Sequence, residues 1–218
     1  VRPKDRTPRP ATVLPELRTA WAGLLPGQER LGAELLTRWQ EPGRHYHGVV
    51  HLAATLQALA LVQPEPSRPA ALALWFHDAV YTGTAGADES ASAELAATAL
   101  AGTGLPTAEI EETVRLVLLT SDHQTTAADT TGAAVLDADL AVLGSNPGRY
   151  HVYARDVRLE YSRFSDTEFA AGRLAVLDRL TSRPALFQTA AGRELWAEAA
   201  AVNLRSERRR WARWLPVD

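Results

Sequence analysis

The chain has 218 residues, of which 46% are hydrophobic, with a formal net charge of −3 and no cysteine. This length and composition predict one domain with a sizeable core, while the absence of cysteine excludes disulfides, iron–sulfur clusters and cysteine-based zinc sites. Any metal must therefore be held by His, Asp and Glu, and the near-neutral charge balance argues against a general nucleic-acid binder.

The first fifteen residues, VRPKDRTPRPATVLP, contain four prolines and no helical spacing of apolar residues. This pattern is typical of an unfolded segment, so we expect residues 1–12 to be a disordered tail and residues 13–218 to form a single domain. No apolar run approaches the roughly 18 residues that a membrane-spanning helix needs, and the first residues lack the apolar core of a signal peptide. We therefore expect a cytoplasmic protein with no membrane partner.

Helical spacing of apolar residues dominates the rest of the chain. The breaks between periodic segments carry proline or glycine, as in EPGR, QPEPSRP, GTGLP and GSNPG, and Ser165 and Glu168 have the spacing of a capping box. No pair of alternating β-branched runs flanks a tight turn, so we expect no strands and an all-α bundle. Helices are predicted at 14–24, 28–40, 46–61, 69–80, 88–102, 107–120, 133–143, 148–162, 166–181 and 192–213.

Histidines and a carboxylate stand out along these helices. The segment HYHGVVH puts His47 and His51 four residues apart, which would place both imidazoles on one face of the helix 46–61. In LALWFHDAV, His77 and Asp78 follow a continuous apolar run, and burying such an ionisable pair costs several kcal/mol unless something compensates it. A further histidine, His123 in TSDHQTT, falls at a helix end or in the loop that follows.

The segment LDADLAVLG offers two more carboxylates, which helical geometry separates. Leu136, Leu140 and Leu143 define a core stripe, from whose centre Asp139 lies about 60° and Asp137 about 90° away at 100° per residue. Asp139 is therefore the better candidate for a carboxylate that points inward.

Each of these residues has a purely structural explanation when taken alone. A single histidine on an apolar face is usually a hydrogen-bonded core residue, and a histidine at a helix end interacts favourably with the helix dipole. Their combination in one core is more informative, because neutral imidazoles and carboxylates together suit a divalent ion that neutralises the buried charge. We therefore expect one divalent metal ion, drawn from Mn, Co, Ni, Mg, Zn or Fe.

The order His, His-Asp, Asp on an all-α chain resembles the HD-domain superfamily of metal-dependent phosphohydrolases. The blocks WQEPGRHYHGVVHLAATLQAL, ALWFHDAVYTG, DESASAELAA, LDADLAVLG, YHVYARDVRLEY and AGRLAVLDRLTSRP, within roughly residues 38–205, are similar to one bacterial branch described as predicted HD-superfamily metal-dependent phosphohydrolases. The resemblance implies an HD-type helical bundle with its metal held in the core by His51, His77, Asp78 and Asp139.

The YHGVVH element also resembles the Tyr-His-Asn-x-x-His element of cyclic-nucleotide phosphodiesterases, which share this architecture. That resemblance implies that His51 binds the metal and that His47 donates a proton, and the segment 138–140 matches the Ala-Asp-Leu that supplies a later ligand. Gly48 replaces the asparagine of the motif, so the contacts around the ligands need not be the same.

The function implied is hydrolysis of a small phosphoester, a nucleotide or related metabolite. Water activated by the metal would attack phosphorus, Asp78 could accept its proton, and His47 could protonate the departing alkoxide. Four other side chains are candidates for substrate contacts, each with a structural alternative. They are Arg44 and Arg158 for phosphate charge or a salt bridge, Glu89 for substrate or a helix N-terminal charge, and His123 for phosphate or a weak second metal site.

Two other functions remain open from the sequence. An HD-type di-iron oxygenase would need more histidines than this chain offers, and a metal-stabilised binding or regulatory protein would show little turnover. The basic segment SERRRWARW could contact single-stranded nucleic acid, but a helix that covers the core with Trp211 and Trp214 explains it better. The aromatic and arginine-rich helices could also form a homodimer interface.

Overall fold

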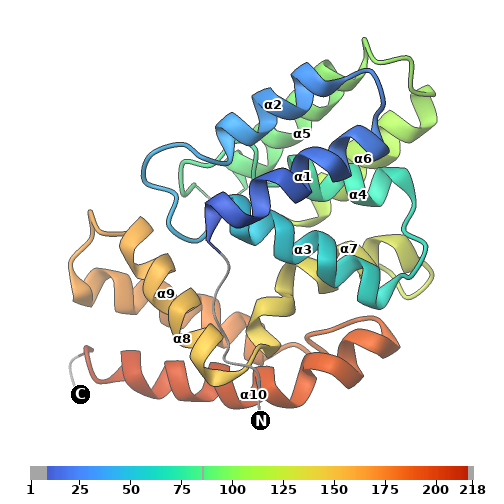
Figure 1. Ribbon diagram of the computed structural model, residues 1–218. Helices are drawn as coiled ribbons and strands as arrows, with labels where there is room; N and C mark the ends of the chain where they lie inside the picture. The colour runs from blue at the N-terminus through green and yellow to red at the C-terminus, as the bar shows by residue number, and fades with distance from the viewer. Residues whose placement is uncertain (1–8, 85, 216–218) are drawn as a thin grey trace.

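The computed structural model describes residues 9–84 and 86–215, which form α-helices joined by turns (Figure 1). No β-strand occurs in these two ranges, so the all-α prediction is confirmed. The helices are α1 (Pro10–Leu24), α2 (Glu29–Arg38), α3 (Val49–Val62), α4 (Arg68–Phe76), α5 (Ala87–Leu100), α6 (Thr107–Leu119), α7 (Thr130–Leu140), the 3₁₀ helix η1 (Ala141–Gly144), α8 (Pro147–Glu160), α9 (Asp166–Thr181) and α10 (Ala190–Ala212).

The start of α1 corrects the predicted tail. Residues 1–8 of that tail lie outside the described residues, but the helix begins at Pro10 rather than at residue 14. Proline suits the first helical turn because its ring fixes a helical φ and it needs no N–H donor there. The Thr12 hydroxyl also donates a hydrogen bond of 2.7 Å to the carbonyl of Arg9, which anchors this turn.

Most of the other helix ends agree with the sequence pattern within three residues. The capping box at α9 is confirmed, since Ser165 Oγ accepts from the Glu168 amide and Glu168 accepts from the Ser165 amide. Two ends differ in ways that affect the site: α3 begins at Val49 instead of residue 46, and α4 ends at Phe76 instead of residue 80.

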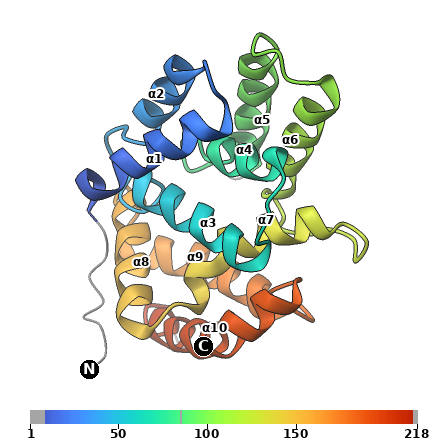
Figure 2. The same ribbon diagram turned by 45° about the vertical axis from the view of Figure 1, so that its right-hand side comes forward.

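The helices enclose two hydrophobic cores. Helices α1 to α7 bury a first core rich in large side chains, among them Trp21, Trp39 and Trp75. Helices α8, α9 and α10 bury a second core, and Trp196 on α10 packs against both. Figures 1 and 2 show α10 running along the base of the molecule, with α8 and α9 between it and the N-terminal helices.

Helix packing brings three helix ends together between these cores. Helix α3 packs against α4 and α7, and α4 packs against α7. The first turn of α3, the residue after α4 and the last turn of α7 therefore meet, and they carry His51, His77 and Asp139 respectively.

The C-terminal helix is only partly as predicted. Trp211 is buried in the second core, where its Nε1 donates to Glu207, whereas Trp214 is 48% exposed and lies beyond the end of α10. The expectation that both tryptophans cover the core is therefore wrong for Trp214. Among the described helices, none has the length and hydrophobicity needed to cross a lipid bilayer.

Candidate metal centre

Side chains from α3, α4 and α7 converge at one buried point. His51 Nε2 lies 3.1 Å from Asp139 Oδ1 and 3.3 Å from His77 Nε2, and His77 Nε2 lies 3.4 Å from the same carboxylate oxygen. Both histidines are nearly inaccessible to solvent, with 3% and 2% of their surface exposed. Within the described part of the chain, these three side chains form the group whose ligand atoms lie close enough together to hold a metal ion, all within 4.8 Å of one another.

Asp78 reaches the same point from the turn after α4. Its Oδ2 lies 3.1 Å from His77 Nε2 and 3.7 Å from His51 Nε2. Two ligand atoms on one ion, with bonds of 2.0–2.2 Å, lie about 2.8–3.6 Å apart in octahedral or tetrahedral geometry. The atom pairs of His51, His77 and Asp139 fall in that range, so these three side chains fit a single small divalent ion, and Asp78 lies beside the two histidines.

The tautomer of His77 favours metal binding. Its Nδ1 lies 2.8 Å from the carbonyl oxygen of Leu74, which can only accept, so Nδ1 carries the proton. The lone pair of a neutral ring is then on Nε2, which faces the cluster. An imidazole held through its other nitrogen by a carbonyl is the usual arrangement for a metal-binding histidine.

Charges in the cluster depend strongly on one another. Burial opposes the imidazolium form of His77, but the carboxylates of Asp78 and Asp139 outweigh burial and raise its pKa well above the ordinary 6.5. Burial likewise opposes ionisation of Asp139, yet the neighbouring histidines hold its pKa well below the usual range. Burial dominates at His51, whose pKa is lowered. A cation is therefore strongly favoured at this point, whether it is a proton or a metal ion.

The two carboxylates of α7 have different tasks, as the helical periodicity predicts. Asp139 points into the cluster, whereas the fully buried Asp137 accepts hydrogen bonds from the amides of Gln188 and Thr189 and from the Thr189 hydroxyl. Asp137 thereby fixes the start of α10 against α7.

His123 joins the cluster from the outer side. Its Nε2 lies 2.8 Å from Asp139 Oδ2, so Asp139 lies between His123 and the two buried histidines. His123 has a φ of 54°, a left-handed conformation that is uncommon outside glycine and that clusters at functional sites. Its carbonyl accepts from Arg183 Nη1 and Gln188 Nε2, which hold this conformation in place.

His47 lies beside the cluster but not on α3, so the prediction that it shares a helix face with His51 is wrong. Gly48 has an extended backbone and the helix begins after it, which leaves His47 in the preceding turn. The His47 ring stacks on Tyr81, with centroids 4.3 Å apart, and its centroid lies 5.8 Å from that of His51.

Glu160, at the end of α8, holds this turn and was not identified from the sequence. Its Oε1 accepts from the amides of His45, Tyr46 and His47 at 2.7–2.9 Å, and its Oε2 lies 2.6 Å from His47 Nδ1. The imidazole is partly buried, with 22% of its side chain exposed, which opposes its charge, but Glu160 reverses this effect and raises the pKa of His47.

A signal for Glu160 was present in the helix 148–162. It follows the buried Tyr153 by seven residues and Val157 by three, and so continues the apolar stripe with a carboxylate. A charge at that position indicates a buried partner.

The arrangement combines a cation-attracting cluster with a proton-bearing imidazole at its edge. Comparisons with protein-family models, curated proteins and solved structures found no match.

Arg44 positions the site instead of facing a substrate. Its guanidinium donates to the carbonyls of His47, Asp78 and Ala79, and it pairs with Glu41. Only 3% of its side chain is exposed. Arg44 thus ties the His47 turn to the turn after α4, and of its two predicted roles these contacts favour the salt bridge over phosphate binding.

The other predicted arginine also has a structural role. The guanidinium of Arg158 donates to Asp166 and to the carbonyls of Tyr161 and Phe164, which fixes the turn between α8 and α9. Of the two roles predicted for Arg158, a substrate contact and a salt bridge, these contacts favour the salt bridge. Glu89 accepts from the Gly86 amide at the start of α5 and also lines a cavity beside the cluster, so both of its predicted roles remain open.

The cavity lined by Glu89 has a volume of about 230 Å³ and reaches the cluster at Asp139. It contains two arginines that were not identified from the sequence. Asp139, His123 and His47 lie in its wall, together with Arg179 from the last turn of α9 and Arg183 just after it. Arg183 donates to the carbonyls of Asp122 and His123, and burial together with the charge of Arg179 lowers its pKa.

Arg179 differs from the other arginines around the site. Its guanidinium has no hydrogen-bond or ion-pair partner among the residues that the structure describes, although it lies near the like charge of Arg183. We call this cavity the arginine cavity. Its two arginines offer donors to an anion, and the carboxylates of Glu89, Asp122 and Asp139 also line its wall.

Proposed function

We propose that this protein is a metal-dependent phosphohydrolase that acts on a small phosphoester, a nucleotide or related metabolite. The observation that carries the proposal is the convergence of His51, His77, Asp78 and Asp139, with His47 at the edge of the same cluster. The resemblance of the sequence to HD-domain phosphohydrolases supports it, and so does the arginine cavity beside Asp139.

The four cluster side chains would hold one divalent ion. Such an ion supplies a Lewis acid, which lowers the pKa of water and polarises a phosphoryl group. Asp78, the most exposed of the four with 16% of its side chain accessible, is the carboxylate that accepts the proton of the attacking water. The water oxygen forms a bond to phosphorus as the ester P–O bond breaks.

His47 completes the reaction by giving its Nε2 proton to the departing oxygen, so that the products are a phosphate and an alcohol. Glu160 accepts from Nδ1 and raises the pKa of His47, which favours the protonated imidazole that the step requires. Tyr81, stacked on the ring and hydrogen-bonded to Glu160, limits its rotation.

The arginine cavity would receive the phosphoryl oxygens. A guanidinium offers two parallel N–H donors that match phosphate oxygens, and Arg179 has its donors free for this purpose. We expect Arg179→Ala to raise KM for a phosphoester about tenfold, as for the loss of one charge-assisted hydrogen bond. Arg209→Ala, at an exposed position on α10, is the matched control and should leave KM unchanged.

The test of the function is a turnover screen. Nucleoside mono-, di- and triphosphates, cyclic nucleotides and sugar phosphates are assayed with Mn²⁺, Co²⁺, Ni²⁺ and Mg²⁺ in turn. We expect turnover with at least one pair, a loss of at least about 10²-fold in His47→Ala, and no change in the exposed His151→Ala. No turnover with any pair, or equal turnover in His47→Ala, would favour a binding protein over an enzyme.

A further inference from the structure

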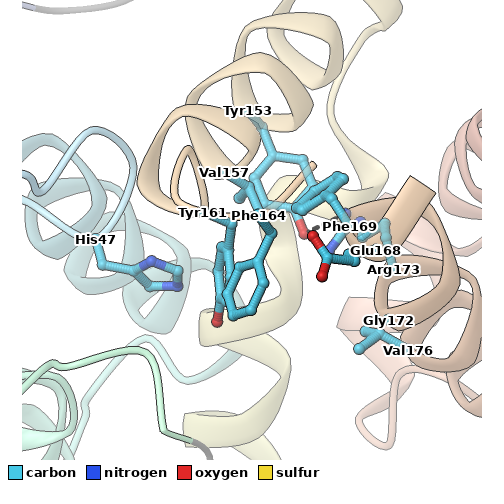
Figure 3. A pocket seen from close by; sticks show the side chains of 10 residues that line it. All are labelled: His47, Tyr153, Val157, Tyr161, Phe164, Glu168, Phe169, Gly172, Arg173 and Val176. Carbon is cyan, nitrogen blue, oxygen red and sulfur yellow. Dashed lines mark hydrogen bonds between the residues drawn. The ribbon is translucent and has the colours of Figure 1, made fainter. Parts of the chain in front are cut away.

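A second cavity, of about 440 Å³, lies on the other side of His47 (Figure 3). Figure 3 shows the rings of Tyr161 and Phe164 next to each other, with His47 on one side of them and Gly172 and Val176 on the other. Most of its wall is apolar and comes from α8, α9 and the turn between them, so we call it the aromatic cavity. Its lining residues are His47, Tyr153, Val157, Tyr161, Phe164, Glu168, Phe169, Gly172, Arg173 and Val176.

The aromatic cavity adjoins the arginine cavity. Three residues, His47, Tyr153 and Val176, line both. The imidazole of His47 therefore lies where the arginine cavity meets the apolar one. A molecule that spans the two chambers would have its charged end near Asp139 and its uncharged end against the rings.

Gly172 keeps the aromatic cavity open. It lies in the middle of α9, and a Cβ built at this position meets no atom within 4 Å. A glycine inside a helix lowers helix stability relative to alanine, and no close packing contact requires one here. The space that it leaves is part of the cavity wall, so the missing side chain enlarges the volume available to a ligand.

Phe164 adds an aromatic surface at the same place. It is 38% exposed although it is a large apolar side chain, and it stacks on Tyr161 with ring centroids 6.2 Å apart and an angle of 28° between the planes. Exposed rings beside a polar site are typical of surfaces that receive the flat apolar part of a ligand.

We propose that the aromatic cavity binds an aromatic ring on the leaving group of the substrate, while the arginine cavity binds its phosphoryl group. The substrate class is thereby narrowed to phosphoesters that carry a planar ring on the alcohol side, and His47 lies between the ring and the phosphoryl group. This inference rests on the proposed function, because it takes the cluster as the place where the ester bond is broken.

The test measures binding with two phosphonates, whose C–P bond is not hydrolysed. Benzylphosphonate and methylphosphonate are titrated calorimetrically into the Mn²⁺-loaded chain, since they share the anionic group and differ in the ring. We expect benzylphosphonate to bind at least about tenfold more tightly than methylphosphonate, because burial of a ring in an apolar cavity provides that much additional binding free energy.

Two glycine variants locate the ring. Gly172→Leu fills the aromatic cavity, and it should bind the two phosphonates with equal affinity. Gly23→Leu makes the same change at another helical position where a Cβ meets nothing within 4 Å, and it should keep the tenfold preference. Leucine is a better helix former than glycine, so we expect the melting temperature of Gly172→Leu to be at least that of the wild type.

Three results would overturn the inference: no preference in the wild type, a preference that persists in Gly172→Leu, or binding of neither phosphonate. Failure of the proposed function gives a different pattern. If the tenfold preference is present and is lost in Gly172→Leu, but no phosphoester is turned over, the cavity binds the ring and the hydrolytic function is wrong. Turnover without the preference leaves the function and rejects the ring site.

Discussion

Glu160 acts on His47 from 113 residues further along the chain. It binds three consecutive amides with one oxygen and an imidazole with the other, so it determines both where His47 lies and which ring nitrogen is protonated. A carboxylate acceptor at Nδ1 leaves Nε2 as the nitrogen that can donate to a substrate.

Glu160→Gln separates these two effects. The amide oxygen can still accept from the three backbone N–H groups, but the NH₂ group now faces Nδ1 and the carboxylate charge is lost. We expect a decrease in turnover of roughly 10²-fold and an alkaline limb of the rate profile that moves to lower pH, because the pKa of His47 falls.

A merely structural role for Glu160 would give a different result. Turnover would then fall with no movement of the pH profile. Far-UV circular dichroism and the melting temperature, measured on the same variant, show whether the turn around His47 remains folded.

His77 makes metal affinity depend on pH. Its pKa is raised above 6.5 by Asp78 and Asp139, so at about pH 6.5 the metal must displace a proton. The apparent affinity should therefore rise about tenfold per pH unit up to the folded pKa and level off above it. Titration calorimetry in two buffers of different ionisation enthalpy counts the proton released, and an affinity that is flat between about pH 5.5 and 7.5 would contradict this.

The raised pKa of His77 also makes the folding stability of the metal-free chain depend on pH. A pKa that is higher in the folded state gives stability that is fully present below the unfolded value of 6.5 and is lost as pH rises through the folded pKa. We expect added metal to restore that stability at high pH.

At the scale of helices, the site depends on how α7 is held. Asp129 caps this helix, since its Oδ1 accepts from the Gly132 amide at 2.8 Å, and it pairs with Arg115 and Thr125. The Arg115 side chain, followed by lesser contributions from Thr125 and Gly132, lowers the pKa of Asp129 to about 2. Helix α7 carries Asp139 near its other end, so its start fixes one side of the cluster.

Asp129→Ala removes the cap and should lower the free energy of unfolding by about 1 kcal/mol in urea denaturation. Asp129→Asn retains a capping oxygen and should cost less, because asparagine caps helices as well as aspartate does. Equal losses in the two variants would show that the ion pair with Arg115, and not the cap, provides the stability.

The positions of the helices follow from the sequence because apolar periodicity and the turn residues between helices are local signals. The same local geometry correctly selects Asp139 over Asp137 for the cluster. His47 was misplaced because α3 begins only after Gly48, at Val49, about one turn later than periodicity alone indicates.

The remaining site residues depend on tertiary contacts. Glu160 at the end of α8 reaches the turn before α3 through tertiary contacts, and Arg179 and Arg183 line the cavity beside the cluster in the same way. Their positions in the sequence follow no periodic pattern that predicts their approach to the cluster. Arg44 and Arg158 were predicted near a substrate, but their guanidinium groups donate to backbone carbonyls. Such hydrogen bonds cannot be predicted from the sequence.

At the scale of the whole molecule, a buried ionic network holds the second core together. Arg173 on α9 donates to both carboxylate oxygens of Glu207 on α10 and to the hydroxyl of Tyr153 on α8. Glu207 also accepts from Tyr150 and Trp211. One pair of charges thus joins α10 to α8 and α9, the two helices that form the aromatic cavity.

Breaking this pair from one side should be costly. Glu207→Leu leaves the Arg173 charge buried and unpaired, so we expect a loss of about 3–5 kcal/mol in the free energy of unfolding. Adding Arg173→Met removes the orphaned charge and should recover a large part of that loss. A double variant as unstable as the sum of the single ones would show that the two charges do not interact.

Calorimetric titration of the chain with Mn²⁺ tests most directly whether one divalent ion is held where α3, α4 and α7 meet. We expect one ion per chain, with affinity reduced by more than about 100-fold in Asp139→Ala, since loss of even an outer partner of a ligand costs 10–100-fold. His151→Ala, an exposed histidine on α8, should bind as the wild type does. Failure of the wild type to bind, or equal binding by Asp139→Ala, would contradict the account.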